Sequence, residues 1–379
     1  MDNIHTFFLR VSSRCNLDCS YCYVFKHNDN SWKKLPKKMS KSTITLFAYR
    51  LKEFVNQKQI AKVYIIFHGG EPLLIGDSVI ISYIDIITNV LDGMISLEFS
   101  LQTNGVLLSD KFLVEAEKRK LGISLSVDGP EEIHNKNRKV RNGIGSFEKV
   151  MSGITKLKRH PALFQGVIGV IDPYSEPNEI FNFFSTNELY NIDLLLPDAN
   201  YSRPPLYREF TPDIYTNWLI KSFDIWFDCY QEISFRTYEN ILKKLMGIES
   251  STDFFGFGNL DYLTIETDGS YHTSDILKVA YENASRIGIS LKTDPICNAA
   301  AHERVVEYNS LLLEENLPKK CTKCQINKIC SGGSLPHRYS VNNNFDNPTI
   351  YCNEMMALIS HAKVRLDSQL MVETKFNVV

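Results

Sequence analysis

The chain has 379 residues, of which 44% are hydrophobic and 23% charged, and its formal net charge is −2. This length suits two domains or one large barrel with an appendage, and the near-neutral charge offers no basic surface for nucleic acid. No charged start followed by an apolar run marks a signal peptide, and no stretch reaches the ~18 apolar residues of a membrane span. We therefore expect a soluble, cytoplasmic protein whose partners include neither nucleic acid nor a membrane.

Short apolar, β-rich runs recur through the first half of the chain, at 6–11, 63–69, 97–104, 121–129, 164–172 and 192–198. Helix-like stretches lie between them, at 40–58, 75–92, 109–120, 146–159 and 176–189. Nearly continuous apolar runs are typical of strands buried on both faces, and alternating strands and helices predict a parallel sheet with right-handed crossovers. The expected fold class is therefore α/β, as a partial (β/α)6 barrel of the TIM type.

The pattern changes after residue 200. Residues 201–212 form a Pro-rich connection, 213–247 look helical, and 261–275 read as a hairpin with its turn near Asp268 and Gly269. A second group of cysteines lies at 321–352, and a helix is expected from 353. The predicted domains are a barrel at 1–212, a helical bridge at 213–260, a cluster-binding domain at 261–352 and a C-terminal helix at 353–379.

Three of the nine cysteines lie in "RCNLDCSYC", directly after the first predicted strand: Cys15, Cys19 and Cys22. An odd number of clustered cysteines favours metal or redox sites over disulfides in a reducing compartment. A [4Fe–4S] cluster normally takes four thiolates, so three leave one iron open, while zinc with three ligands also keeps an open position. From the cysteines alone, an iron–sulfur cluster, zinc and chance grouping all remain open.

Further polar motifs follow the next predicted strands: "GGEP" at 69–72, "TNG" at 103–105 and "DGP" at 128–130. The carboxyl ends of barrel strands are where barrel enzymes carry their chemistry. We therefore expect these motifs and the three-cysteine loop to form one site.

Taken together, the Cys-x3-Cys-x2-Cys spacing, "GGEPLL", "LQTNG" and "SLSVDGP" resemble the radical SAM superfamily over residues 5–200. This resemblance implies a partial (β/α)6 barrel and a [4Fe–4S] cluster held by Cys15, Cys19 and Cys22, with S-adenosylmethionine bound to the open iron. Its one-electron cleavage gives a 5′-deoxyadenosyl radical, which is cofactor chemistry that the protein orients. The implied partner for this step is an external reductant of the flavodoxin or ferredoxin type.

The same resemblance implies the contacts to S-adenosylmethionine. Glu71 is the candidate that pairs with the methionine ammonium, and a surface turn carboxylate is its alternative role. A solvated surface position is the alternative for Arg138, because "HNKNRKVRN" is a basic run. The full set of expected cofactor contacts is Tyr21, Gly69, Gly70, Glu71, Pro72, Ser126 and Arg138.

The second group of cysteines has the spacing C-x2-C-x5-C-x21-C and consists of Cys321, Cys324, Cys330 and Cys352. Four thiolates close a metal site, and the spacing alone leaves structural zinc open. The region resembles the SPASM domain of radical SAM enzymes that modify peptides, which implies one auxiliary [4Fe–4S] cluster here. Ser274 and Ser334 stand where that family has ligands of a further cluster, so we expect two clusters in total. Cys229 and Cys297 are expected to be ordinary buried thiols.

Asp275 directly follows Ser274, at a place where some relatives have a carboxylate that acts as a base near the substrate. The alternative is a carboxylate that caps a helix starting at Ile276. Both readings remain open.

Three stretches, at 19–40, 193–205 and 267–278, resemble the SPASM-type maturases that install three-residue cyclophanes in ribosomally made peptides. This resemblance implies a C–C bond between an aromatic ring carbon and the β-carbon of a residue two positions later, in a precursor peptide. Asp275 would take the proton released, and the auxiliary cluster would take the electron or brace its domain. Because the predicted barrel starts near the first residue, we expect no separate leader-binding domain before it.

Other functions remain open. Sibling enzymes form thioether or ether crosslinks, or oxidise a Cys or Ser side chain as sulfatase maturases do, although the lost cluster ligands argue against the last. A non-catalytic zinc protein would leave the first three cysteines and "GGEP" unexplained. Among the residues near the predicted site, His68 is expected to be structural. Most nearby aromatic side chains are expected to pack in the core.

Overall fold

The computed structural model describes residues 4–248, 257–258 and 260–376. The chain forms two compact units, each assembled from separate stretches. The first unit comprises residues 1–127, 131–168 and 260–309, and the second comprises 128–130, 169–259 and 310–379.

A mostly parallel sheet forms the centre of the first unit. Its parallel strands follow one another in sequence and in space: β1 (Thr6–Ser12), β2 (Lys62–Gly69), β3 (Ser96–Thr103), β4 (Gly122–Ser126) and β5 (Phe164–Val170). On the other side of β1, the sheet continues in the order β8 (Tyr262–Ile265), β9 (Ser270–His272) and β10 (Arg286–Ser290). β8 runs parallel to β1, whereas β8–β9 and β9–β10 are antiparallel.

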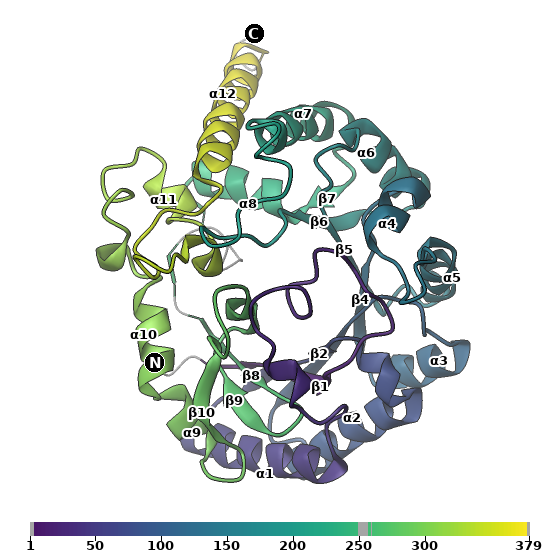
Figure 1. The fold of residues 1–379 in the computed structure, drawn as a ribbon. Helices are drawn as coiled ribbons and strands as arrows, with labels where there is room; N and C mark the ends of the chain where they lie inside the picture. Colours follow the sequence, from purple (N-terminus) through teal and green to yellow (C-terminus); the bar gives the residue numbers. More distant parts are fainter. Residues whose placement is uncertain (1–3, 249–256, 259, 377–379) are drawn as a thin grey trace. The chain divides into compact units, whose positions relative to one another are not determined.

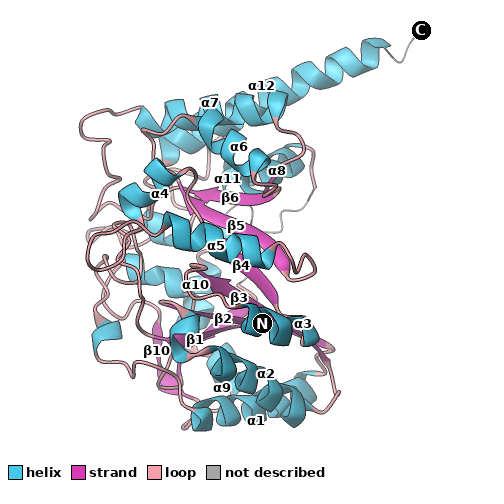
Figure 2. Cartoon of the chain, turned by 90° about the vertical axis from the view of Figure 1, so that its right-hand side faces the viewer, coloured by secondary structure: helices cyan, strands magenta, loops and turns pink. Residues whose placement is uncertain are grey.

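Helices α1, α2, α3 and α5 lie outside the curve of strands, and the loop that follows β1 lies inside it (Figure 1). The side-chain oxygens of Ser40 and Ser109 accept hydrogen bonds from backbone N–H groups, which fixes the starts of α1 and α3. α9 packs beside α1 (Figure 2). The helices of this unit are η1 (Ser31–Lys33), α1 (Lys41–Lys58), η2 (Pro72–Ile75), α2 (Asp77–Leu91), α3 (Asp110–Lys118), α4 (Glu131–Asn137), α5 (Phe147–Leu157), η3 (Asp275–Val279), α9 (Ile296–Ala300) and α10 (Glu303–Ser310).

The second unit is mainly helical. Its strands β6 (Asn191–Leu195) and β7 (Ser234–Phe235) pair in parallel. Its long terminal helix α12 (Cys352–Phe376) packs along α7 (Ile214–Cys229), where His361 bonds to Asp224 at 2.7 Å. The remaining helices are α6 (Pro177–Thr186), α8 (Arg236–Leu245), η4 (Glu314–Asn316), α11 (Asn327–Cys330) and η5 (Leu335–Arg338).

The predicted elements agree closely with this fold. All six strands and five helices expected before residue 200 are present, with ends that differ by a few residues. The α/β prediction is confirmed, and the hairpin at 261–275 is formed by β8 and β9. α4 was not predicted, and neither was the parallel pairing of β8 with β1, which joins segments far apart in the chain.

Some expectations lie partly outside the described residues. These include residues 249–256 and 259 of the predicted bridge and residues 377–379 of the predicted terminal helix. The predicted domain boundaries stay a prediction. Within the described residues, no helix is both long and apolar enough to cross a membrane.

Candidate active site

The three-cysteine loop follows β1 and is held by backbone contacts to a segment near α4. The N–H of Asp18 donates to the carbonyl of Lys139 at 2.7 Å, and the N–H of Ser20 donates to the carbonyl of Asn137 at 3.2 Å. Within the loop, the N–H of Cys22 donates to the carbonyl of Cys19 at 3.3 Å. The loop therefore has a defined shape between β1 and α1.

The three thiols of this loop lie close enough to influence one another. Burial, together with the charges of Glu71, Cys19 and Cys22, raises the pKa of Cys15 to about 12. All nine cysteines of the chain are described as thiols without disulfides. In the parts of the chain that the structure describes, no three His, Cys, Asp or Glu side chains are arranged to hold a single metal ion. The assignment of the loop to a [4Fe–4S] cluster stays a prediction.

The "GGEP" motif runs against the start of the cysteine loop. The N–H of Gly70 donates to the carbonyl of Ser12 at 2.8 Å, and that of Glu71 donates to the carbonyl of Arg14 at 2.9 Å. A Cβ on Gly70 would stand 2.3 Å from the Arg14 carbonyl oxygen, which no side chain tolerates. Gly69 has a φ of 139°, a conformation that favours glycine. Both glycines therefore let this turn approach the loop closely enough to place Glu71.

Glu71 is fully buried, so its predicted alternative as a surface turn carboxylate is wrong. It accepts hydrogen bonds from Leu73 N at 3.0 Å, Thr103 Oγ1 at 2.7 Å and Asn104 N at 2.8 Å. Burial raises the pKa of Glu71, although these donors oppose the shift. No cationic side chain of the described residues pairs with it. A buried carboxylate without a counter-charge fits a ligand that brings an ammonium group.

The other predicted cofactor contacts lie around the same loop. The guanidinium of Arg138 lies over the ring of Tyr21, at 5.6 Å from its centre, and Arg138 is buried. A solvated surface position for Arg138 is therefore wrong. Ser126 ends β4 and accepts a hydrogen bond from Gln102 Nε2 at 3.0 Å. Their roles toward S-adenosylmethionine stay predictions.

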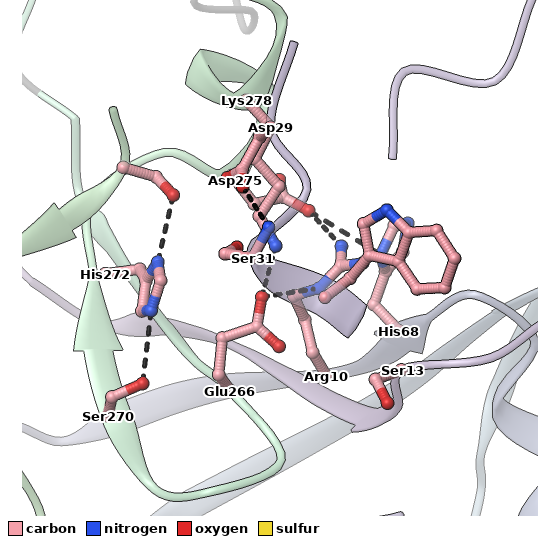
Figure 3. Close-up of polar contacts among 12 residues, drawn as sticks. Arg10, Ser13, Asp29, Ser31, His68, Glu266, Ser270, His272, Asp275 and Lys278 are labelled. Carbon is pink, nitrogen blue, oxygen red and sulfur yellow. Dashed lines mark hydrogen bonds and ion pairs between the residues drawn. The ribbon is translucent and has the colours of Figure 1, made fainter. Parts of the chain in front are cut away.

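Asp275 belongs to a buried ionic cluster that the strand register builds. Arg10 of β1 pairs with His68 of β2, and Leu9 pairs with Ile265 of β8, so Glu266 follows beside Arg10. Figure 3 shows Arg10 between His68 and Glu266, with Asp275 above it. Asp275 contacts Arg10, and its Oδ2 accepts a hydrogen bond from Tyr23 Oη at 2.8 Å.

The capping alternative for Asp275 does not hold. The short helix η3 begins at Asp275, its N-cap residue is Ser274, and no side-chain hydrogen bond caps it. The carboxylate of Asp275 turns instead to Arg10 and Tyr23. Burial would raise the pKa of Asp275, but the charge of Arg10 together with His68, Lys278 and Tyr23 lowers it to about 2.

Residues 9–184 match the model of the Radical SAM superfamily. This chain contains a radical SAM domain. The resemblance predicted from the sequence is thereby confirmed, and the chain is an enzyme. The superfamily binds a [4Fe–4S] cluster and S-adenosylmethionine. The three thiols and the unpaired Glu71 of this radical SAM domain suit those two groups.

Similar proteins extend this comparison. A cysteine-type anaerobic sulfatase-maturating enzyme of Clostridium novyi (strain NT) is 26% identical over 352 residues, which cover 90% of this chain and 90% of the relative. The solved structure of native anSMEcpe with bound AdoMet and Kp18Cys peptide has a TM-score of 0.82 and 24% identity, over 96% of this chain and 98% of that one. The solved structure of Streptococcus suis SuiB bound to precursor peptide SuiA has a TM-score of 0.52 and 13% identity, over 89% of this chain and 73% of that one. The structural likenesses show the fold, whose mostly parallel sheet is consistent with a partial barrel.

The second unit carries the other predicted cysteine site. Burial, together with the charges of nearby cysteines, raises the pKa of Cys321 to about 11 and that of Cys330 to about 12. Arg338 is 2% exposed, and among the described residues it donates only to backbone carbonyls, including those of Ser331 and Leu311. No carboxylate of the described residues pairs with it. A buried cation beside buried thiols fits an anionic, thiolate-ligated centre.

The positions predicted to lack cluster ligands hold ordinary polar contacts. Ser274 Oγ accepts a hydrogen bond from Tyr262 Oη at 2.6 Å, and Ser334 is buried. Cys229 is exposed, so the expectation that it is buried is wrong. Cys297 is half-buried, and its Sγ contacts Gln57 at 2.8 Å.

Arg10 of the buried ionic cluster was not predicted from the sequence, whereas His68 was expected to be structural. Arg10 carried a usable clue, because a charged residue inside an otherwise apolar buried strand is rarely accidental. The sequence did not indicate the hydrogen bond of Tyr23, since its partner Asp275 lies far along the chain. Phe67 of β2 lies in the core, as expected for most aromatic side chains near the site.

Proposed function

We propose that this chain is a radical SAM enzyme that crosslinks a ribosomally made precursor peptide, by joining an aromatic ring carbon to the β-carbon of a nearby residue to form a cyclophane. The observation that supports this most is the position of Asp275. It bonds to Tyr23, the residue next to Cys22, so an ionised carboxylate lies beside the loop proposed to hold the radical-generating cluster. A proton acceptor is needed there for a ring that must regain aromaticity.

When bound, the cluster and S-adenosylmethionine would supply a 5′-deoxyadenosyl radical that takes a hydrogen atom from the peptide β-carbon. In this proposal Cys15, Cys19 and Cys22 hold the cluster. Glu71 orients S-adenosylmethionine by its ammonium group, with Tyr21, Gly69, Gly70, Pro72, Ser126 and Arg138 around it.

Closing the C–C bond and restoring the ring releases one proton and one electron from the peptide. Asp275 is the residue that we assign to the proton, because it is ionised at neutral pH and within reach of the cysteine loop. Cys321, Cys324, Cys330 and Cys352 would hold one auxiliary [4Fe–4S] cluster, which would take the electron. The proposed partners are the precursor peptide and a flavodoxin- or ferredoxin-like protein that supplies electrons. The proposed location of the enzyme is the cytoplasm.

A second candidate is the oxidation of a Cys or Ser side chain in a protein substrate. The similarity to a sulfatase-maturating enzyme over 90% of this chain favours it. Ser274 and Ser334 weigh against it, because they stand at positions expected to hold ligands of a further cluster in that family. We therefore prefer the crosslinking reaction.

The two candidates differ in their products. The enzyme, reconstituted with iron and sulfide and reduced anaerobically, would be incubated with S-adenosylmethionine and a pool of synthetic peptides. Some peptides carry Trp, Phe or Tyr two positions before a residue with a β-hydrogen, and others carry a single Cys or Ser instead. In mass spectrometry, a peptide that has lost two hydrogens and gives no fragment ions from cleavage between two of its residues supports the crosslink. Loss confined to one Cys or Ser side chain supports oxidation and overturns the crosslink.

A further inference from the structure

A buried ionic cluster surrounds Asp275 in the first unit. Arg10, Glu266 and Lys278 each have side chains that are only 1% exposed. Charged side chains are almost never buried to this extent unless they are paired. Each of these charges lies beside an opposite charge, since Lys278 contacts Glu266, Glu266 Oε1 lies 3.1 Å from Arg10 Nε, and Arg10 also contacts Asp275.

The register of the sheet explains why Arg10 is central to this cluster. Arg10 lies on β1 with His68 beside it on β2 and with Glu266 beside it at the end of β8. Asp275 and Lys278 both come from η3, which follows the β8–β9 hairpin. Arg10 is therefore the residue that links the first strand of the radical SAM domain to the carboxylate of η3 (Figure 3).

We propose that Arg10 is a positioning residue for Asp275: it fixes one carboxylate oxygen and leaves the other free to take the proton that leaves the substrate. This inference rests on the proposed function, in which Asp275 is the proton acceptor. Arg10 acts through Asp275 and does not itself touch the reacting atoms.

The contacts of the two oxygens of Asp275 differ in the way that this role requires. Oδ2 accepts hydrogen bonds from Arg10 Nη1 and Tyr23 Oη, and His68 Nδ1 lies 4.0 Å from it. In the described part of the chain, Oδ1 has no hydrogen-bond partner. An anchored carboxylate with one open oxygen is fixed in direction, and geometric errors of about 1 Å are enough to cost a large part of a rate.

Glu266 and Lys278 make this arrangement electrically balanced. The cluster holds two cations, Arg10 and Lys278, and two anions, Glu266 and Asp275. Burial would raise the pKa of Glu266, but Lys278 and Arg10 lower it to about 2, so it stays ionised. Lys278 forms its ion pair with Glu266, so of the two cations only Arg10 contacts Asp275 directly.

The remaining groups that face Asp275 do not replace Arg10. Burial lowers the pKa of His68 to about 4, so its ring is neutral near pH 7 and gives Asp275 no full charge. Burial raises the pKa of Tyr23, so Tyr23 stays a neutral donor. Lys278 forms its ion pair with Glu266. Without Arg10, burial would therefore dominate and raise the pKa of Asp275.

The test compares Arg10→Met, Arg10→Lys and Asp275→Asn in the full chain, with the peptide that gives product from the pool described above. Two products are measured, the modified peptide and 5′-deoxyadenosine, and their ratio is followed from about pH 6 to pH 8. Arg304→Met is the matched control. It removes a part-buried arginine of the same unit that bonds to the Ala284 carbonyl and to Tyr308, outside the cluster.

In wild type, and in Arg304→Met, the ratio should be constant over this pH range. In Arg10→Met it should fall roughly tenfold or more, with 5′-deoxyadenosine still formed, and should recover as pH rises because Asp275 must first ionise. Arg10→Lys keeps the charge but lacks the planar fork, so the ratio should fall less and stay constant with pH. Arg10→Lys also keeps the test valid if Arg10→Met does not fold.

The outcomes separate this inference from the function on which it rests. If Asp275→Asn loses the product while both Arg10 variants keep the wild-type ratio at every pH, the role of Arg10 is wrong and the proton acceptor stands. If Asp275→Asn keeps the wild-type ratio, Asp275 is not the acceptor and both proposals fall. A fall of the ratio in Arg304→Met equal to that in Arg10→Met would mean that Arg10 only supports the fold.

Discussion

The backbone N–H of Asn104 donates to Oε2 of Glu71 at 2.8 Å, so the end of β3 holds the carboxylate that follows β2. Asn104 also reaches the cysteine loop, where its Nδ2 lies 3.8 Å from Cys15 Sγ and 2.8 Å from Asn16 Oδ1. Motifs from three successive strands thus meet at Glu71. Within the described part of the chain, only neutral donors hold the carboxylate of Glu71, which leaves its charge for a ligand.

Glu71→Gln should weaken the binding of S-adenosylmethionine while preserving the fold, because glutamine keeps the shape and loses the charge. Removing one partner of a buried charge pair costs about 2–5 kcal/mol, which corresponds to roughly 30-fold or more in affinity. Anaerobic isothermal titration of the reconstituted enzyme with S-adenosylmethionine measures this. Since burial raises the pKa of Glu71, wild-type affinity should increase as pH rises through that pKa.

Glu98→Gln is the matched control for Glu71→Gln, because Glu98 is a half-exposed carboxylate of β3 that pairs with Lys62. Its affinity for S-adenosylmethionine should equal that of wild type. Equal affinities of Glu71→Gln and wild type would contradict the role of Glu71.

Iron content should distinguish the two cysteine sites. Wild type should hold about eight iron atoms per chain, and the triple variant Cys15→Ala/Cys19→Ala/Cys22→Ala about four. Cys229→Ala, a change of an exposed thiol outside both groups, should leave the count unchanged. About four irons in wild type and none in the triple variant would mean that the second group holds zinc or no metal.

Much of this site could be predicted from the sequence because its parts are local. Each motif directly follows an apolar run, and parallel strands bring the ends of such runs together without further information. Glu71 is an example, since "GGEP" alone indicated its chemistry and the structure adds its burial and its three donors.

The ionic cluster could not be predicted in the same way, because its partners are far apart in the chain. Arg10 and Asp275 are separated by 265 positions, and they meet only because β8 pairs with β1. A short hairpin gives no sequence pattern for its partner strand. The same reason explains Tyr23, whose hydroxyl reaches Asp275 across 252 positions.

Acid should destabilise the first unit through Glu266 and Asp275. The pKa of both carboxyls is lowered to about 2 from ordinary values near 4, so the stability that they contribute is full above about pH 4 and is lost as pH falls toward 2. For Glu266 this amounts to roughly 3 kcal/mol. The charge-balanced variant Glu266→Gln/Lys278→Met should therefore lose less stability than wild type between pH 7 and pH 3 in urea unfolding. An identical loss in both proteins would show that Glu266 does not govern acid stability.

Arg338 should raise the midpoint potential of a cluster at the second cysteine site. It is a buried cation with no carboxylate partner in the described residues. Burial lowers its pKa, while the charges of Cys321 and Cys330 oppose that shift. The experiment uses the Cys15→Ala/Cys19→Ala/Cys22→Ala background, in which about four irons of one cluster remain. Arg338→Met should make the midpoint potential of this cluster more negative, since removing a nearby positive charge disfavours the added electron.

Arg338→Lys in the same background should keep most of the potential, because it retains the charge although it loses several of the carbonyl contacts. Arg365→Met is the control, since Arg365 of the same unit pairs with Asp224 and Asp228 of α7 and, in the described part of the chain, has no cysteine of the second group among its charged neighbours. Redox titration followed by electron paramagnetic resonance reads the potential directly. An equal potential in Arg338→Met and its parent would show that the charge of Arg338 does not reach the cluster, and loss of iron in Arg338→Met alone would make its role one of cluster retention.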